Sequence, residues 1–247
     1  MGLSGKERAI LEVKNLHKSY SGKRVVQGLS FFVREGQVVG LLGPNGSGKT
    51  TAFYMVIGLI RSKQGRVFFR GRDVTYKPVH VRAKMGMGFL SQEPSIFQYL
   101  TVEQNILCIL ETLSISRAER IRRLQECLEE LHLTPLAKKR AGTLSGGERR
   151  RLEITRSLIT SPSLLLLDEP FANIDPLTIH DLKKMVHYLK SRNISILITD
   201  HNAREVSSII DYSYLVQDGR VTYSGTIEEL LRNRGARTHY FGEDFEL

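Results

Sequence analysis

Short apolar runs alternate with helical patterns through the middle and the second half of the chain. The runs at residues 38–42, 164–167 and 194–199 are almost continuously apolar, as strands buried on both faces of a parallel sheet are. Apolar residues at helical spacing occupy five further segments: 51–60, 102–113, 117–131, 149–159 and 176–190. This alternation predicts an α/β core with a mainly parallel sheet.

The two ends of the chain have other patterns. Residues 10–16 and 24–33 mix apolar and polar positions around a turn signal, which favours antiparallel strands. Near the other end, Asp218 and Gly219 are typical of a hairpin turn, and residues 226–233 have the pattern of a short helix. We therefore expect an antiparallel β layer at the start of the chain.

Residues 93–160 contain helical patterns without an intervening strand pattern, which predicts a helical subdomain inserted at about these positions. For residues 1–247 we expect one domain that ends in a charged tail at about residues 234–247. No stretch approaches the roughly 18 uncharged apolar residues of a membrane-spanning helix, and the first ten residues lack the apolar region of a signal peptide. We therefore expect a cytoplasmic protein.

A phosphate-binding motif, GxxxxGK[ST], follows the first buried run and opens the first helical segment. Its glycines let the loop curl so that backbone N–H groups and the helix N-terminus cradle phosphate oxygens. The lysine adds a charge for the β- and γ-phosphates, the threonine hydroxyl suits Mg²⁺, and the adjacent Thr51 is a further expected contact. The motif predicts a site for ATP and Mg²⁺ made by Gly43, Pro44, Asn45, Gly46, Ser47, Gly48, Lys49 and Thr50.

Two adjacent acids, Asp168 and Glu169, end the apolar run at 164–167. Because side chains alternate along a strand, the two carboxylates should point in opposite directions and have different roles. We expect Asp168 to hold Mg²⁺, directly or through water, and Glu169 to polarise an attacking water as a general base.

A second expected anion site lies at Ser145, Gly146 and Gly147, which open the helical segment 149–159. A hydroxyl, free N–H groups and the positive end of a helix converge there. Since residues 43–50 already form one phosphate cradle, the natural ligand of the second site is a nucleotide held by a partner subunit.

The phosphate-binding motif, Leu144-Ser-Gly-Gly-Glu148 and the Asp168–Glu169 pair together resemble the ABC ATPase family over nearly the whole chain. The resemblance implies a P-loop NTPase core and a head-to-tail homodimer that encloses two ATP molecules. It also implies that hydrolysis, with Glu169, His201 and Lys49 as catalytic residues, requires the closed dimer.

Four further positions match the family's motifs in order. By the resemblance, Tyr20 stacks on adenine, and Gln92 touches Mg²⁺ or water and senses the transport partner. Asp175 communicates across the dimer, and His201 contacts the γ-phosphate. Each residue alone would carry little weight, because packed tyrosines and hydrogen-bonded histidines are common.

The net charge of +10 suggests an anionic partner, and residues 61–84 alone carry eight basic side chains and one acid, a net charge of +7. A soluble ABC ATPase acting on nucleic acid is one reading of this stretch, although few aromatic residues are interleaved for stacking. The chain keeps the residues expected to catalyse hydrolysis, which argues against a regulatory module without ATPase activity. One cassette without long heptads favours a subunit of a membrane transporter, with no direct contact to nucleic acid.

Local strings go further than the general family pattern, notably residues 92–97, 198–202 and 241–247. They resemble the ATPases of lipopolysaccharide export systems, which work on the cytoplasmic face of the inner membrane with transmembrane permease subunits. The resemblance implies that Phe97 lines a groove for a short permease helix, with a packed core phenylalanine as the alternative. ATPases of branched-chain amino-acid importers share most of the general motifs and remain the second reading.

Four positions depart from the pattern of these exporters: Ser91, Pro94, Gln98 and Asn173. None of them removes a residue expected to bind nucleotide or to catalyse hydrolysis. The first three lie around Gln92 and Phe97, so they concern the contact with the permease.

Overall fold

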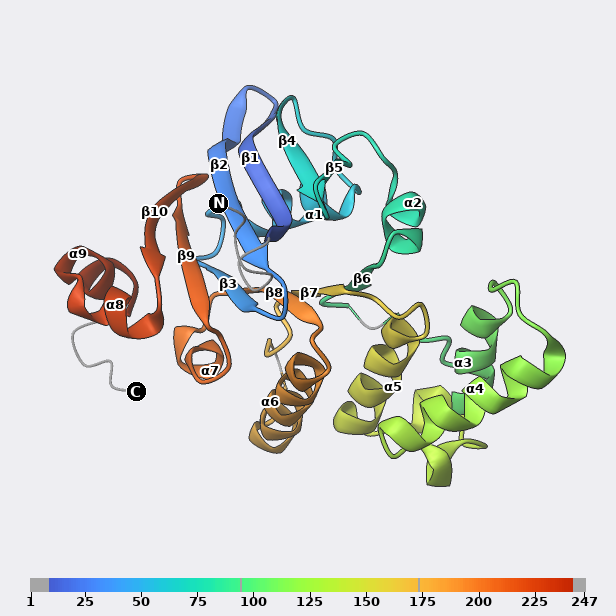
Figure 1. Cartoon of the computed structure of the whole chain (residues 1–247). Helices are drawn as coiled ribbons and strands as arrows, with labels where there is room; N and C mark the ends of the chain where they lie inside the picture. The colour runs from blue at the N-terminus through green and yellow to red at the C-terminus, as the bar shows by residue number, and fades with distance from the viewer. Residues whose placement is uncertain (1–8, 94, 173, 242–247) are drawn as a thin grey trace, which may run out of the picture.

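Two sheets with helix α1 (Lys49–Ile57) between them form the centre of the molecule (Figure 1). The structure, a computed structural model, describes residues 9–93, 95–172 and 174–241. The expected roles of Pro94, Asn173 and residues 242–247 therefore lie outside the described residues. The α/β class predicted from the sequence is confirmed, with both parallel and antiparallel strands.

The larger sheet has six strands, and its central pairs are parallel. In spatial order they are β10 (Arg220–Gly225), β9 (Tyr212–Gln217), β3 (Val38–Leu42), β8 (Ser195–Asp200), β7 (Leu164–Asp168) and β6 (Met87–Leu90). Strands β3, β7 and β8 are buried at every residue, as their apolar runs predict. Only β10 pairs antiparallel, through the hairpin at Asp218 and Gly219.

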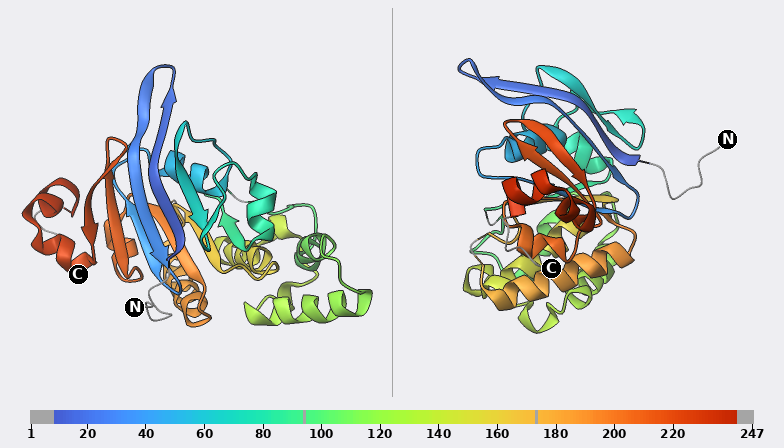
Figure 2. Two further views of the ribbon diagram at one scale, coloured as in Figure 1. Left: turned by 45° about the horizontal axis from the view of Figure 1, so that its top comes forward. Right: turned by 90° about the vertical axis from the view of Figure 1, so that its left-hand side faces the viewer.

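The smaller sheet is antiparallel and covers α1. Its order is β2 (Lys23–Arg34), β1 (Ala9–Tyr20), β4 (Gln64–Phe69) and β5 (Arg72–Asp73). Figure 2 shows the long hairpin of β1 and β2 projecting beyond the other elements. Strands β4 and β5, with the following helix α2 (Val79–Lys84), occupy the basic stretch for which the sequence indicated no regular structure.

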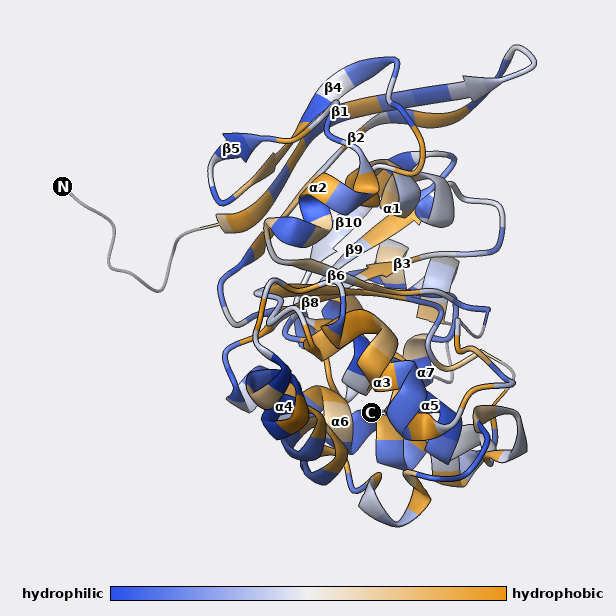
Figure 3. Ribbon diagram, turned by 90° about the vertical axis from the view of Figure 1, so that its right-hand side faces the viewer, coloured by the Kyte–Doolittle hydropathy of each residue, from blue (hydrophilic) through white to orange (hydrophobic). Residues whose placement is uncertain are grey.

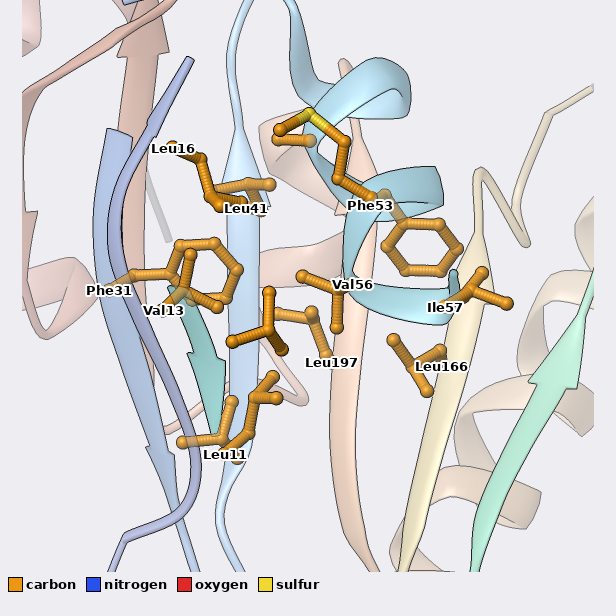
Figure 4. Close-up of a cluster of buried hydrophobic side chains, with 14 of the residues drawn as sticks. Leu11, Val13, Leu16, Phe31, Leu41, Phe53, Val56, Ile57, Leu166 and Leu197 are labelled. Carbon is orange, nitrogen blue, oxygen red and sulfur yellow. The ribbon is translucent and has the colours of Figure 1, made fainter. Parts of the chain in front are cut away.

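Apolar side chains of α1 pack against both sheets. Phe53, Val56 and Ile57 lie among Leu11 and Phe31 of the small sheet, and also among side chains of β3, β7 and β8 (Figure 4). All are almost fully buried. Alternate residues of the central strands face the other side, where helix α6 (Pro176–Ser191) and its neighbours cover them. This packing fixes α1, and with it the loop that precedes it.

A separate apolar cluster holds the helices between β6 and β7 together. They are α3 (Val102–Leu110), α4 (Arg117–Glu130), η1 (Thr134–Leu136), η2 (Ala141–Thr143) and α5 (Gly146–Leu158). Most of α4 is hydrophilic in Figure 3, and it buries only Cys127 and Leu128. Side chains at Thr101, Ser116 and Ser145 cap α3, α4 and α5.

The remaining short elements follow β8 and β10: α7 (Ala203–Ser207), α8 (Ile227–Arg232), α9 (Arg234–Ala236) and a π turn, η3 (Arg237–Phe241). Tyr240 and Phe241 of this turn pack against the cluster beneath the larger sheet. The described end of the chain therefore lies beside the carboxyl ends of the central strands.

Candidate nucleotide-binding site

The phosphate-binding loop, residues 43–50, joins the carboxyl end of β3 to α1. Gly43 and Gly48 have φ of 155° and 99°, conformations that residues with a Cβ rarely adopt. A Cβ at Gly43 would lie 2.2 Å from the carbonyl oxygen of Val216, and one at Gly48 would lie 2.4 Å from that of Val25. Only glycine fits these two positions, and Thr50 and Thr51 follow in the first turn of α1.

Lys49 lies inside this loop, with its side chain 3% exposed. Its Nζ donates hydrogen bonds to the carbonyl oxygens of Gly43, at 2.8 Å, and Pro44, at 2.9 Å. Burial lowers the pKa of Lys49, and neighbouring carboxylates, Glu169 first among them, oppose that shift. The ammonium therefore sits between the loop and the acids at the ends of β7 and β8.

Asp168 ends β7 and is 1% exposed. Its Oδ1 accepts a hydrogen bond from Thr199 Oγ1 at 2.6 Å, whereas its Oδ2 is buried with no hydrogen-bond partner in the described residues. Burial raises the pKa of this carboxyl, against the hydrogen bond from Thr199. A buried carboxylate oxygen without a donor fits a cation ligand, because such an oxygen is costly to leave unpaired.

Glu169 follows Asp168 with a left-handed backbone, φ 41°. Its N–H donates to the Thr199 carbonyl at 2.9 Å, which holds this conformation. Its Oε2 lies 3.4 Å from His201 Nδ1, and the His201 side chain is 41% exposed. The residue expected to be the general base and the residue expected to contact the γ-phosphate are therefore neighbours.

The backbone around His201 is fixed from two sides. Asp200 Oδ1 accepts hydrogen bonds from the N–H groups of His201 and Asn202, both at 2.8 Å. From the C-terminal π turn, Tyr240 donates its hydroxyl to the His201 carbonyl at 3.4 Å. Burial raises the pKa of both Asp200 and Tyr240.

The second anion site lies at the start of α5. Ser145 Oγ accepts from Glu148 N, and Glu148 Oε2 accepts from Ser145 N, which forms a capping box. A Cβ added at Gly147 would lie 3.6 Å from Thr178 Oγ1, so the start of α5 lies close to the start of α6.

Asp175 caps α6 at the same place. Its carboxylate accepts hydrogen bonds from Thr178 N at 3.0 Å and Thr178 Oγ1 at 2.6 Å, and these two bonds hold its pKa below the usual range. Thr178 therefore connects the Asp175 cap to the Ser145–Gly147 segment.

Tyr20 and Gln92 are more exposed and make fewer contacts. Tyr20, at the end of β1, is 45% exposed, and Lys18 Nζ lies 5.2 Å from the centroid of its ring. Gln92 lines a cavity of about 510 Å³ together with Gly146 and Glu169. That cavity connects the end of β6, the start of α5 and the end of β7.

Sequence reasoning missed two residues that organise this site, Thr199 and Tyr240. Thr199 is paired in register with Asp168 through the parallel strands β7 and β8, which brings its hydroxyl to the carboxylate. Its position two residues before His201 was the available signal. Nothing in the sequence pattern pointed to the contact of Tyr240 with the His201 loop.

Comparisons with known proteins agree with this geometry. The model of the ABC transporter family matches residues 26–172. A lipopolysaccharide export system ATP-binding protein, LptB, of Acidithiobacillus ferridurans is 46% identical over 96% of this chain and 99% of its own length. LptB of Escherichia coli strain K12 is 43% identical over 97% of this chain and all of its own.

A solved structure also matches over nearly all of the chain. The ADP conformation of an ATP-binding cassette of an ABC transporter superposes with a TM-score of 0.85 at 30% identity, covering 96% of this chain and 100% of the other. The chain belongs to the ABC transporter family, as an ATP-binding cassette that hydrolyses ATP. Every helix in the described ranges is too short or too polar to cross a bilayer.

Proposed function

We propose that this chain is the ATPase of a lipopolysaccharide exporter, in which two copies enclose two ATP molecules and drive extraction of lipopolysaccharide from the inner membrane. The Glu169–His201 pair beside the phosphate-binding loop carries the catalytic part of the proposal. The relatives named for lipopolysaccharide export, which match over almost their whole length, support the exporter part. The protein then works on the cytoplasmic face of that membrane.

In this mechanism Glu169 accepts the proton of the attacking water, and His201 holds the Glu169 carboxylate and contacts the γ-phosphate. Lys49 turns from the loop carbonyls to the phosphate oxygens. Thr50, Asp168 and Gln92 would hold Mg²⁺, which neutralises phosphate charge when bound. The unpaired buried Oδ2 of Asp168 supports this assignment.

Completion of the site requires the second copy. Ser145, Gly146 and Gly147 present a capped helix start that donates to the γ-phosphate of the partner's ATP. Tyr20 stacks on adenine. It lies in the hairpin of β1 and β2, and β2 places Val25 against Gly48 of the phosphate-binding loop. Asp175, linked to the same segment through Thr178, transmits the state of one site to the other.

The permease contact is proposed at a groove between α1, α2 and α5, with a volume of about 230 Å³. Its lining includes Ile57, Val79 and Phe89, and Arg156. The Arg156 guanidinium also stacks over the ring of Phe97, 4.8 Å from its centroid. Phe97 is 48% exposed, so it is not the packed core residue of the alternative reading.

The backbone of the loop at Phe97 is held in place by hydrogen bonds to Asn105. Asn105, fully buried at the start of α3, accepts from Phe97 N at 2.9 Å and donates to Phe97 O at 3.0 Å. An exposed aromatic ring on a rigid loop suits a short amphipathic helix, because such anchors carry much of the energy of an interface.

The test is co-purification of the ATPase with its permease subunits from native membranes. For Phe97→Ala we expect at least about tenfold less bound permease, since loss of a buried aromatic anchor costs about 2 kcal/mol or more. Tyr99→Ala, at a 90% exposed aromatic two residues away, is the matched control and should bind normally. Recovery of solute-importer permeases, or normal binding by Phe97→Ala, would contradict the proposal.

A further inference from the structure

The basic stretch at residues 61–84 is not spread over the molecule. Its chain runs from the end of α1 through β4 and β5 to α2, and these elements lie together in Figure 3. Six of its exposed cations form no ion pair with a carboxylate in the described part of the chain: Arg61, Lys63, Arg70, Arg72, Lys77 and Lys84. Arg70 and Arg72 lie at the turn between β4 and β5, whereas the other four lie around the ends of α1 and α2. In contrast, Arg66 pairs with Asp73 at 3.0 Å.

One buried side chain fixes the geometry of this region. Arg82, 2% exposed, donates to the carbonyl oxygens of Met55 and Val56 at the end of α1. It also donates to the carbonyls of Thr75 and Lys77, at 2.9 and 2.8 Å. These bonds therefore hold the end of α1 and the segment before α2 in one unit.

That unit forms one wall of the groove proposed for the permease helix. Ile57, Val79 and Arg82 line the groove. Arg61 and Lys63 follow α1, Lys77 precedes α2, and Lys84 ends α2. We call Arg61, Lys63, Lys77 and Lys84, with Leu59 and Tyr76, the basic rim. Leu59 and Tyr76 are 54% and 67% exposed.

Exposed cations next to an exposed leucine and tyrosine are the combination found at membrane interfaces. Lysine and arginine attract anionic headgroups, whereas tyrosine and leucine enter the boundary between headgroups and acyl chains. A nucleic-acid groove would instead favour several stacking aromatics along the cationic track. Residues 61–84 contain three aromatic residues, Phe68, Phe69 and Tyr76, and of these Tyr76 alone is largely exposed.

We propose that the basic rim binds the anionic surface of the membrane beside the permease. The proposal rests on the groove assignment above, since a permease helix that enters the groove brings the bilayer close to the rim. Contact with headgroups then adds to the groove contact and helps to keep the ATPase at the membrane during cycles of nucleotide binding and hydrolysis.

The experiment uses the purified ATPase without permeases and sedimentation with two kinds of vesicle. One kind is phosphatidylcholine alone, and the other contains an equal part of phosphatidylglycerol. At low ionic strength we expect binding to the anionic vesicles only. Because each cation contributes about fivefold, replacing all four rim cations by glutamine should lower the partition coefficient about 100-fold or more. Added salt should weaken the wild-type binding.

A matched variant controls for net charge. It carries glutamine at four exposed basic positions outside the rim: Arg117, Lys139, Lys184 and Arg232. This variant should retain most of the vesicle binding, and both variants should keep the wild-type melting temperature. Leu59→Ser with Tyr76→Ser should weaken binding without changing the charge.

Three results would overturn the proposal: equal binding by wild type and rim variant, an equal loss in the control variant, or equal binding to both kinds of vesicle. Rim-dependent binding to a single-stranded oligonucleotide, without binding to vesicles, would assign the surface to nucleic acid instead. The groove assignment is tested separately, because Phe97→Ala should bind anionic vesicles normally while losing the permease.

Discussion

At the scale of one residue, Asp168 lowers the stability of the folded protein at neutral pH. Its carboxylate is buried with one oxygen unpaired in the described structure, and burial raises its pKa. A carboxyl whose pKa is raised on folding stabilises the fold below its unfolded pKa of about 3.9 and loses this contribution as the pH rises through the folded value. At neutral pH the ionised group is therefore a burden on stability.

Asp168→Asn should accordingly raise the melting temperature of the nucleotide-free protein at pH 7. About 1 kcal/mol shifts the midpoint by about 2–4 °C in a domain of this size, and the gain should shrink as the pH falls toward 4. The same variant should lose the further stabilisation that Mg²⁺ adds to ATP. Asp181→Asn, on α6, controls for the loss of one acid. A lower melting point for Asp168→Asn would refute this reading.

Single residues also show what the sequence could and could not predict. Lys49, Asp168 and Glu169 stand in recognisable local strings, so their chemistry could be expected before the fold was described. Thr199 could not be placed in this way, because it lies 31 positions after Asp168 and their contact depends on the register of strands β7 and β8. The contact of Tyr240 with the His201 carbonyl depends likewise on how the chain end packs.

At the scale of elements, the short continuous apolar runs predicted the central strands correctly, because burial on both faces leaves no polar positions between them. Strand β4 was missed for the opposite reason. It buries Val67 and Phe69 and exposes only Gln64 and Arg66, so the alternating pattern is too short to stand out within a basic stretch. Helix α2, six residues long, is held by Arg82 rather than by its own sequence pattern.

Arg82 supplies the prediction at this scale. Arg82→Met would remove a charged group that donates to carbonyls of α1 and of the segment before α2, and would leave those carbonyls buried. We expect a loss of about 3 kcal/mol in the free energy of unfolding, measured by urea denaturation. Arg66→Met, which breaks an exposed ion pair, should cost less than about 1 kcal/mol. Equal effects of the two variants would show that Arg82 does not join these elements.

At the scale of the whole molecule, the groups expected to act on ATP come from segments that lie far apart in the sequence. Residues of the loop after β3, the ends of β7 and β8, and the C-terminal π turn meet at one edge of the larger sheet (Figure 1). The start of α5, by contrast, faces the start of α6. On the proposed mechanism, each copy offers one phosphate cradle and one further anion site, and a catalytic unit therefore needs two copies.

The most direct test of this account is the molecular mass of Glu169→Gln in solution, by light scattering, with and without ATP and Mg²⁺. Loss of the general base should slow hydrolysis at least about 100-fold, so that bound ATP persists. The account predicts a monomer of 28.0 kDa without nucleotide and a dimer of twice that mass with it. Adding Ser145→Arg should restore the monomer while ATP still binds. A Glu169→Gln protein that stays monomeric at saturating ATP, or hydrolyses ATP at the wild-type rate, would contradict the account.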